Sequence, residues 1–279
     1  MPKKNILQIG PPGSGKTGNL ETLPDSVVHL SFDPGGWETL KRDIPRQGRR
    51  KRNLVGPLTT FREWAKLNQS LSPDDILVVD YSSLPVRVSV DKFQQYEIAP
   101  WNNFLMDFNE IEKIGGAPVI ERRGICNVAV DSLTWMQWTI LEGVVYLESR
   151  TDKGTCVNDY RIAIEKMKEI VKAFCQLPFN FILTAHVESE KDDVTGKIKE
   201  QVLIYGKNLP DLIVSMISDV YYCGVDMSTG TIRSYLYTAP QMFLKIVRQR
   251  SFDNLPIKME ADFSKLYKAG GLYCGGGEK

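Results

Sequence analysis

The stretch of sequence that decides the fold lies near the start of the chain and is Gly10-Pro11-Pro12-Gly13-Ser14-Gly15-Lys16-Thr17. It matches the pattern G-x-x-x-x-G-K-[ST] at every required position. An apolar run over residues 5–10 leads into it, and a short helix-compatible segment follows it and ends near Pro24. Because this pattern binds phosphate where a strand runs through such a loop into a helix, the sequence predicts a phosphate-binding loop, or P-loop.

The residue types of the P-loop each have a task in nucleotide binding. Glycines let the loop curl so that backbone N–H groups point at phosphate oxygens. The ammonium of Lys16 can reach the β- and γ-phosphates, and the hydroxyl of Thr17 can bind Mg²⁺. We therefore expect ATP and Mg²⁺ as cofactors, with nucleotide contacts from Pro12, Gly13, Ser14, Gly15, Lys16, Thr17 and Gly18. The sequence has no guanine-reading Asn-Lys-x-Asp element, which favours ATP over GTP.

The composition is that of a folded, water-soluble protein. Of 279 residues 42% are apolar and 25% are charged, and 35 Lys+Arg against 34 Asp+Glu leave a formal charge of +1, which excludes a histone-like polycation. The five cysteines include no C-x-x-C pair, which excludes a structural zinc framework. No apolar run approaches the ~20 residues that span a bilayer, so we expect a cytoplasmic protein with no membrane partner.

Short apolar runs alternate with longer helix-compatible stretches along the chain. We expect strands over residues 5–10, 27–33, 76–80, 127–131, 179–186, 219–225, 233–237 and 243–247, and helices over 135–150 and 159–177. This alternation predicts an α/β fold with a mostly parallel sheet flanked by helices. Turn signals alone separate the last strands, which predicts antiparallel strands at the C-terminal end. We expect one domain over residues 1–268 with an enlarged insertion around 43–125, and a flexible Gly-rich tail over 269–279.

A P-loop needs a second carboxylate on the magnesium side, at the end of a neighbouring strand. Asp131 and Asp80 each follow an apolar run and compete for this role. We favour Asp131, because a long helical segment and then the strand over 179–186 follow it, which is the order expected of the sheet core. Asp80 is then an ordinary strand-end aspartate in the inserted unit.

Hydrolysis of a phosphate also needs a group that orients or deprotonates the attacking water. Asp33 follows the strand after the P-loop and precedes a Gly-Gly turn, so it is the first candidate base, with Glu38 behind it. A turn-capping role is the alternative for Asp33. His186 ends the strand over 179–186, where a polar side chain would meet the γ-phosphate; a purely structural histidine is the alternative.

Three basic residues lie on or just after the last predicted strand, namely Lys245, Arg248 and Arg250. They would form a solvated strand edge, or they would reach a nucleotide held by an adjacent subunit and stabilise the transition state in trans.

With these motifs in this order, the chain resembles the RecA-like P-loop ATPases over residues 5–265. It looks most like the compact phage nucleotide-binding proteins of the single-strand annealing type. The matching pieces are the P-loop, the acidic Gly-Gly turn at 33–36, Asp131-Ser132, Thr184-Ala185-His186, the Gly-Lys-Asn-Leu-Pro stretch at 206–210 and the basic strand at 243–250.

The resemblance implies ATP binding, Mg²⁺-dependent hydrolysis, assembly into homo-oligomeric rings or filaments, and binding of single-stranded DNA in phage recombination, annealing or replication. A phage-encoded protein would do this in the host cytoplasm. One departure concerns the base: RecA-type ATPases usually have a glutamate at the end of the second strand, where this chain offers Asp33 and then Gly35. Slow hydrolysis, or a different base, is therefore expected.

The DNA hypothesis rests on two segments. Residues 41–52 hold seven basic residues against one acid, and Pro45 and Gly48 predict a loop. Residues 190–200 predict a second loop, and RecA-like proteins place DNA-binding segments at the position of 187–200. Two other functions remain open: a small-molecule P-loop kinase with residues 41–52 as its lid, and a nucleotide-gated interaction module with little turnover. A replicative helicase shares the predicted fold.

Overall fold

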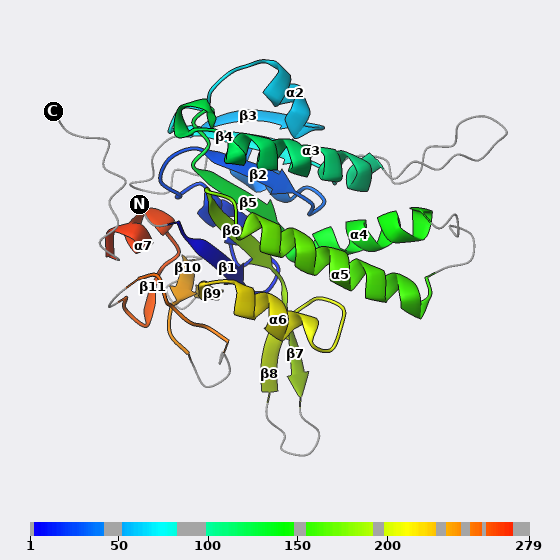
Figure 1. The fold of residues 1–279 in the computed structure, drawn as a ribbon. Helices are drawn as coiled ribbons and strands as arrows, with labels where there is room; N and C mark the ends of the chain where they lie inside the picture. The colour runs from blue at the N-terminus through cyan, green and yellow to red at the C-terminus, as the bar shows by residue number, and fades with distance from the viewer. Residues whose placement is uncertain are drawn as a thin grey trace.

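A mostly parallel sheet of nine strands forms the centre of the part of the chain that the structure describes (Figure 1). The structure is a computed structural model and describes residues 3–41, 52–82, 99–147, 155–191, 198–226, 233–240, 246–252 and 255–269. The strands of the sheet are β1 (Asn5–Ile9), β2 (Val27–Ser31), β3 (Asn53–Leu58), β4 (Asp75–Asp80), β5 (Asn127–Asp131), β6 (Asn180–Ala185), β9 (Asp219–Asp226), β10 (Arg233–Tyr237) and β11 (Lys258–Glu260). Their order across the sheet is β11-β10-β9-β1-β6-β5-β2-β4-β3.

The strands from β9 to β3 in this order run parallel, whereas β10 pairs with β9 and β11 with β10 in antiparallel fashion. The structure therefore confirms the predicted α/β class with antiparallel strands at the C-terminal end. The helices are α1 (Lys16–Leu20), η1 (Gly36–Lys41), α2 (Phe61–Lys66), α3 (Ala99–Gly116), η2 (Val119–Glu121), α4 (Leu133–Leu147), α5 (Val157–Phe174), α6 (Leu209–Met216) and α7 (Phe263–Ala269). Among the described residues, no helix has both the length and the apolar character that a membrane crossing requires.

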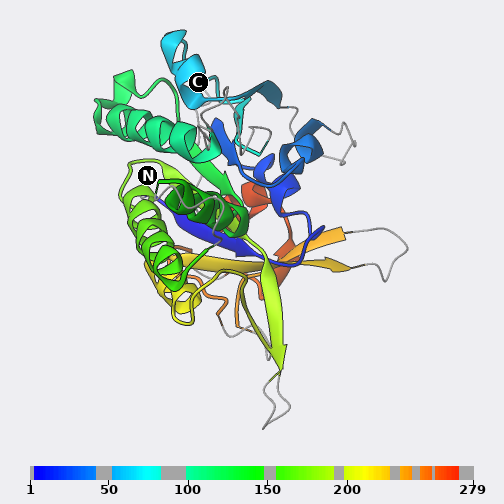
Figure 2. The same cartoon turned by 90° about the vertical axis from the view of Figure 1, so that its right-hand side faces the viewer.

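The sheet is covered on both faces, which is why its central strands are apolar along their whole length. Successive side chains of a strand point to opposite faces. Leu7 and Ile9 of β1 belong to the core cluster that contains the buried residues of α2 to α6, whereas Ile6 belongs to the cluster on the other face, with those of α1, η1 and α7. Figure 2 shows α3 to α6 on one side of the sheet and α1 and η1 on the other. This sandwich leaves the ends of the strands as the place for a site.

The block around 43–125 continues this sheet in its described part, because β4 pairs with β2 and β3 with β4. Asp107 of α3 is fully buried and ties the block together. Its carboxylate accepts hydrogen bonds from the backbone N–H groups of Phe61 and Arg62, from Arg62 Nε and from the hydroxyl of Tyr81. Burial and the nearby Asp107 raise the pKa of Tyr81 well above its usual value. These contacts hold α2 and α3 against the added strands.

The prediction of a second loop over residues 190–200 is wrong for the residues that the structure describes, 190–191 and 198–200. A two-stranded antiparallel hairpin occupies them, with β7 (Val187–Lys191) paired to β8 (Ile198–Val202). Residues 192–197 lie outside the described residues. Half of the residues in the two strands are charged, so their pairing left no run of apolar residues in the sequence. The hairpin projects from the body of the protein (Figures 1 and 2).

Arg52, the last residue of the basic run, has a structural position that the sequence did not indicate. Its guanidinium donates hydrogen bonds to the carbonyl oxygens of Leu23 (2.7 Å), Asp25 (2.6 Å) and Asp75 (3.3 Å). At the other end of the run, the ammonium of Lys41 lies 3.9 Å from the ring centre of Trp37. Residues 42–51 lie outside the described residues. The two described ends of the run therefore support the fold.

We expect Arg52→Ala to lower the free energy of unfolding by about 2 kcal/mol, because it removes charge-assisted hydrogen bonds to three carbonyl groups. Chemical denaturation measures this change, and Lys66→Ala, at an exposed position of α2, is the control that should leave stability unaltered. Equal stability of the two variants would contradict the assignment.

Candidate functional site

Four neighbouring parallel strands, β1, β6, β5 and β2, end at the same edge of the sheet. The P-loop follows β1, His186 follows β6, Asp131 ends β5, and Asp33 comes two residues after β2. Because ligands of open α/β sheets bind outside the carboxyl ends of the strands, this edge is the expected place for a site. The fold thus brings together residues that lie more than 150 positions apart in the sequence.

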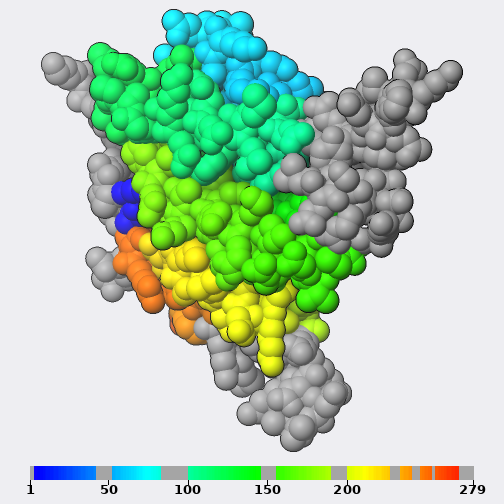
Figure 3. Space-filling view, turned by 45° about the vertical axis from the view of Figure 1, so that its right-hand side comes forward, coloured from blue at the N-terminus to red at the C-terminus, as the bar shows by residue number. Residues whose placement is uncertain are grey.

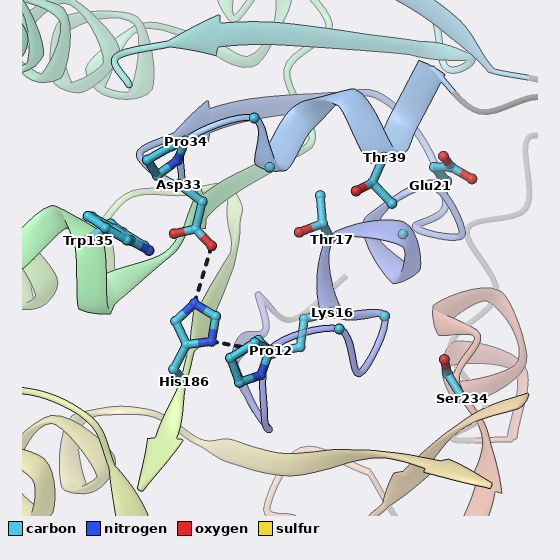
Figure 4. Close-up of a pocket in the computed structure, with 15 residues that line it drawn as sticks. Pro12, Lys16, Thr17, Glu21, Asp33, Pro34, Thr39, Trp135, His186 and Ser234 are labelled. Carbon is cyan, nitrogen blue, oxygen red and sulfur yellow. Dashed lines mark hydrogen bonds and ion pairs between the residues drawn. The ribbon is translucent and has the colours of Figure 1, made fainter. Parts of the chain in front are cut away.

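A cavity of about 620 Å³ lies at this edge (Figure 4). Small-molecule sites typically measure ~300–1,000 Å³. Trp135 and His186 stand toward one end of the cavity and Ser234 toward the other, with the P-loop between them. The predicted nucleotide-binding residues that line it are Pro12, Gly13, Gly15, Lys16, Thr17 and Gly18. Ser14, the remaining one, is buried and its backbone carbonyl accepts from the thiol of Cys223 on β9.

The P-loop requires glycine at two of its positions. A Cβ on Gly10 would clash with the backbone carbonyl of Cys223. Gly15 has a φ of +88°, in the left-handed region that favours glycine, and a Cβ there would meet the hydroxyl of Ser234. The motif therefore has a packing reason in this chain besides its chemistry.

Lys16 lies at the floor of the cavity. Its ammonium donates hydrogen bonds to the carbonyl oxygens of Gly10 and Pro11, each at 2.9 Å, and lies 3.4 Å from Nδ1 of His186. Burial lowers the pKa of Lys16, and the negative charges of Asp131 and Asp33 oppose this effect. A cation held at this position is placed to bind the phosphates of a nucleotide in the loop.

Thr17 and Asp131 form the pair that the sequence predicted for Mg²⁺. The hydroxyl of Thr17 donates to Oδ2 of Asp131 at 2.6 Å, and the hydroxyl of Thr184 donates to Oδ1. Burial alone would raise the pKa of Asp131, but hydrogen bonds and the charge of His29 outweigh it and hold the pKa at about 2. A hydroxyl oxygen beside a carboxylate is the hard donor set that suits Mg²⁺.

His29 is a residue of this site that the sequence interpretation missed. It lies on β2, is fully buried, and its Nε2 is 3.3 Å from Oδ2 of Asp131. Residues that orient a metal ligand in this way usually tune the metal site. A signal was present, because His29 is one of two histidines in the chain and interrupts the apolar strand of Val28 and Leu30.

Asp80, the competing carboxylate, is engaged elsewhere. Its Oδ2 accepts a hydrogen bond from Trp37 Nε1 at 2.9 Å, and its Oδ1 accepts from the backbone and hydroxyl of Ser82. Strand β2 separates β4 from β5. The structure thus places Asp131, and not Asp80, beside Thr17.

Asp33 is held from two sides at the rim of the cavity. Its Oδ1 accepts a hydrogen bond from the hydroxyl of Ser132 at 2.6 Å, and its Oδ2 lies 3.3 Å from Nε2 of His186. Figure 4 shows His186 between Asp33 and Lys16, with an interaction to each. Glu38 is exposed on η1 and is not among the residues that line the cavity. Of the two candidate bases, only Asp33 faces the P-loop.

The basic residues near 248 lie away from the cavity of their own chain. Arg248 forms an isolated bridge with Val220 at the start of β9, and its guanidinium donates to the carbonyl oxygens of Val214 and Ile217 at the end of α6. Arg250 is exposed and its backbone N–H donates to Asp219 at 2.7 Å. The P-loop follows the opposite end of the neighbouring β1. These contacts give Arg248 a structural role.

The strand predicted over 243–247 is not formed at Ile246 and Val247. Residues 243–245, Lys245 included, lie outside the described residues. The short bridge at Arg248 replaces the strand that the alternation of residue types indicated.

The sheet order, the P-loop and the carboxylates at the strand ends define the protein as a RecA-like P-loop ATPase by fold. The model of a family described as AAA domain matches residues 2–243, and the chain belongs to this family. No curated protein matches the chain.

The solved structures that are similar to the chain include two at low identity. One is a KaiC-like protein from the hyperthermophilic archaeon Pyrococcus horikoshii OT3, at 12% identity over 85% of this chain and 78% of that chain, with a TM-score of 0.38. The other is an ATPase of the type III secretion system of pathogenic bacteria, at 13% identity over 78% of this chain, with a TM-score of 0.42. The chain spans 50% of the length of the second.

Proposed function

We propose that the protein binds ATP, hydrolyses it with Mg²⁺, and acts on single-stranded DNA in phage-type recombination, annealing or replication. The observation that carries the catalytic part is the connected row Lys16–His186–Asp33 at one cavity, with 3.4 Å and 3.3 Å between successive polar atoms. Hydrolysis of a γ-phosphate needs a cation that binds the phosphate and a group that deprotonates or orients the attacking water. Lys16 and Asp33 are such groups, and His186 lies between them.

In this proposal the P-loop amides and Lys16 hold the triphosphate, and Asp33 takes the proton of the attacking water. Ser132 and His186 orient the carboxylate of Asp33. Thr17 and Asp131 would hold Mg²⁺, which neutralises charge on the phosphate oxygens. His186 contacts both the cation and the base, so its position would respond to the presence of the γ-phosphate.

The proposal that the protein binds DNA rests on the positive charge of one segment and on the direct connection of a hairpin to the candidate site. The basic run over 41–52 has five cations besides Lys41 and Arg52, and such a segment fits a phosphate backbone. The hairpin β7–β8 begins at the residue after His186, so it is joined directly to the strand end that faces the cavity. We further propose that the protein acts as a homo-oligomer, in which Arg250, which is exposed, and Lys245 would serve a neighbouring subunit.

One observation favours the switch function as a second candidate. Both carboxylate oxygens of Asp33 already have partners, Ser132 and His186. A carboxylate held in this way is well oriented but has little freedom to approach a water molecule. A nucleotide-gated module with little turnover would show this arrangement as well.

The test is the rate of Mg²⁺-dependent ATP hydrolysis with and without single-stranded DNA. We expect hydrolysis that DNA stimulates. The triple variant with Arg49, Arg50 and Lys51 changed to alanine should bind DNA more weakly, and its salt slope should be shallower by about 1 for each phosphate that these side chains neutralise in the wild type. Arg52 is left in place, because it supports the fold.

The other outcomes separate the candidates. A rate of hydrolysis that does not change when DNA is added would support the ATPase activity and reject single-stranded DNA as a partner. Tight ATP binding without turnover would favour the switch. Transfer of phosphate to a nucleoside or nucleotide would indicate a kinase.

A further inference from the structure

The exposed face of α4 carries tryptophan where a helix normally carries polar residues. Among the side chains of α4 that the structure describes, the exposed ones are Trp135, Trp138 and Glu142. Trp135 is 40% exposed and Trp138 is 38% exposed. Residues three apart lie on one face of a helix, so both side chains project from the same face of α4. The core does not need them, since other residues of α4 fill it.

Two tyrosines from other segments extend this face. The ring of Tyr205 meets the ring of Trp138 edge-on, at 4.7 Å between centres and 90° between planes. The ring of Tyr160, on α5, lies 5.6 Å from that of Tyr205. We call Trp135, Trp138, Tyr160 and Tyr205 the aromatic platform. Tyr205 is 39% exposed, so it and the two tryptophans present ring surface to solvent, while Tyr160 is half-buried.

A buried glutamine holds the platform in place. Gln137 is 3% exposed, and its side-chain amide donates to the carbonyl oxygen of Tyr205 at 3.0 Å. Its Oε1 accepts from the backbone N–H of Tyr205 at 2.6 Å. These two bonds clamp the segment between β8 and α6 onto α4. Because the rings are ordered in advance, a ligand that stacks on them loses little conformational freedom.

The platform begins at the nucleotide cavity. Trp135 lines that cavity, on the side of Asp33 and His186 (Figure 4). From there the platform follows α4 toward Tyr160 near the start of α5. Figure 3 shows α5 and α6 next to each other on one face of the molecule. Because Trp135 lines the cavity, a ligand stacked on it would lie at the rim of the site where ATP would bind.

Two exposed cations come shortly after the tyrosines in the sequence. Arg161 follows Tyr160 directly, and Lys207 comes two residues after Tyr205; both are exposed. The acidic residue of the helix face, Glu142, lies one turn beyond Trp138 on α4. Aromatic rings for the bases, with cations beside them for the phosphates, are the features by which proteins bind single strands without sequence preference. These two cations lie in the first turns of α5 and just before α6, whereas the exposed Glu165 and Glu169 lie further along α5.

We infer that the aromatic platform stacks the bases of single-stranded DNA, with Arg161 and Lys207 beside its phosphates. This inference rests on the proposed function and deepens it, because it names the surface that recognises bases. The basic run over 41–52 offers charge alone and contains no aromatic residue. Stacking next to Trp135 would place bound DNA at the rim of the nucleotide cavity.

Tryptophan fluorescence tests the inference on the unmodified protein. Of the five tryptophans, Trp37, Trp64 and Trp101 are buried, so quenching by stacked bases would report on Trp135 and Trp138. We expect oligo(dT) to quench the fluorescence and an abasic strand of equal length to bind without quenching. Binding of oligo(dT) without quenching would overturn the inference.

Variants give the second test, by fluorescence anisotropy of labelled oligo(dT) and of the abasic strand. We expect Trp138→Ala to weaken oligo(dT) binding about 10-fold and to leave the abasic strand unaffected. Trp138→Phe should retain most of the affinity. Leu67→Ala, at an exposed apolar residue after α2, is the control that should bind as the wild type does. Lys207→Ala should weaken the binding of both oligo(dT) and the abasic strand, and it should reduce the salt dependence of binding.

The outcomes distinguish the inference from the function on which it rests. If the wild type binds neither strand, the DNA function and the platform both fail. If the wild type binds oligo(dT) and a folded Trp138→Ala variant binds it equally well, the DNA function stands and the platform is rejected. A variant that loses self-association in sedimentation, with oligo(dT) binding unaltered, would assign the surface to a second copy of the chain and reject the inference.

Discussion

Replacing Lys16 by alanine is expected to lower kcat for ATP hydrolysis by about 10³-fold, which is the upper range for removal of one preorganised donor. The ammonium lies among the carbonyl oxygens of its own loop and 3.4 Å from His186. A nucleotide in the loop would place its terminal phosphates against this charge. Steady-state release of phosphate at saturating ATP measures the change.

The controls for this variant separate the loss of the positive charge from a loss of the folded structure. Lys16→Arg keeps the positive charge but presents it as a planar fork on a different stem, so we expect it to bind ATP while hydrolysing it slowly. Thermal unfolding should show that each variant is folded, with some loss of stability in Lys16→Ala because the hydrogen bonds to Gly10 and Pro11 are removed. A Lys16→Ala variant with wild-type turnover would show that hydrolysis does not take place at this P-loop.

The local parts of the site could be predicted from the sequence. The P-loop depends on glycines at fixed positions, and two of them are required by contacts that only glycine tolerates. The strands that lead to Asp131 and His186 are largely apolar runs, so their existence and approximate ends were visible in the sequence. The choice of Asp131 over Asp80 followed from chain order, and the structure places Asp131 beside Thr17.

The parts that the sequence did not reveal depend on contacts between distant segments. The guanidinium of Arg248 is held by the end of α6, about 30 residues earlier in the chain, and nothing local indicates this. Arg52 is likewise held by carbonyl groups of two other segments. A run of charges shows that a segment is polar, and only the fold shows which of its members are already engaged.

The directions of the side chains near the Gly-Gly turn could not be predicted from the sequence either. Asp33 and Glu38 are five residues apart, and both were reasonable bases. The turn into η1 directs Asp33 toward His186 and leaves Glu38 exposed. A short turn of this kind sets the direction of each side chain through its backbone angles, which composition and spacing do not determine.

Replacing Asp33 by asparagine is expected to lower kcat by about 10²- to 10⁴-fold, the usual contribution of a general base, with little effect on ATP affinity. Asparagine has the same shape and can still accept the hydrogen bond from Ser132, but it cannot take a proton from water. Single-turnover hydrolysis and equilibrium binding of a fluorescent ATP analogue measure the two quantities separately.

Glu38→Gln is the matched control, because Glu38 is the competing carboxylate and does not line the cavity. We expect it to hydrolyse ATP as the wild type does. Loss of activity in Glu38→Gln, with activity retained in Asp33→Asn, would transfer the role of base to Glu38 and require a rearrangement of η1 when nucleotide binds.

The variant Asp33→Glu tests whether the length of the side chain at position 33 limits the rate of ATP hydrolysis. Glutamate is longer by one C–C bond, ~1.5 Å, and is the residue that the resemblance leads one to expect at this position. The wild-type carboxylate is drawn to Ser132 and His186, on the wall of the cavity. If that restraint makes turnover slow, the longer side chain should raise kcat above that of the wild type. A lower kcat in Asp33→Glu would show instead that the bonds to Ser132 and His186 place the base correctly, and that the shorter side chain belongs to this site.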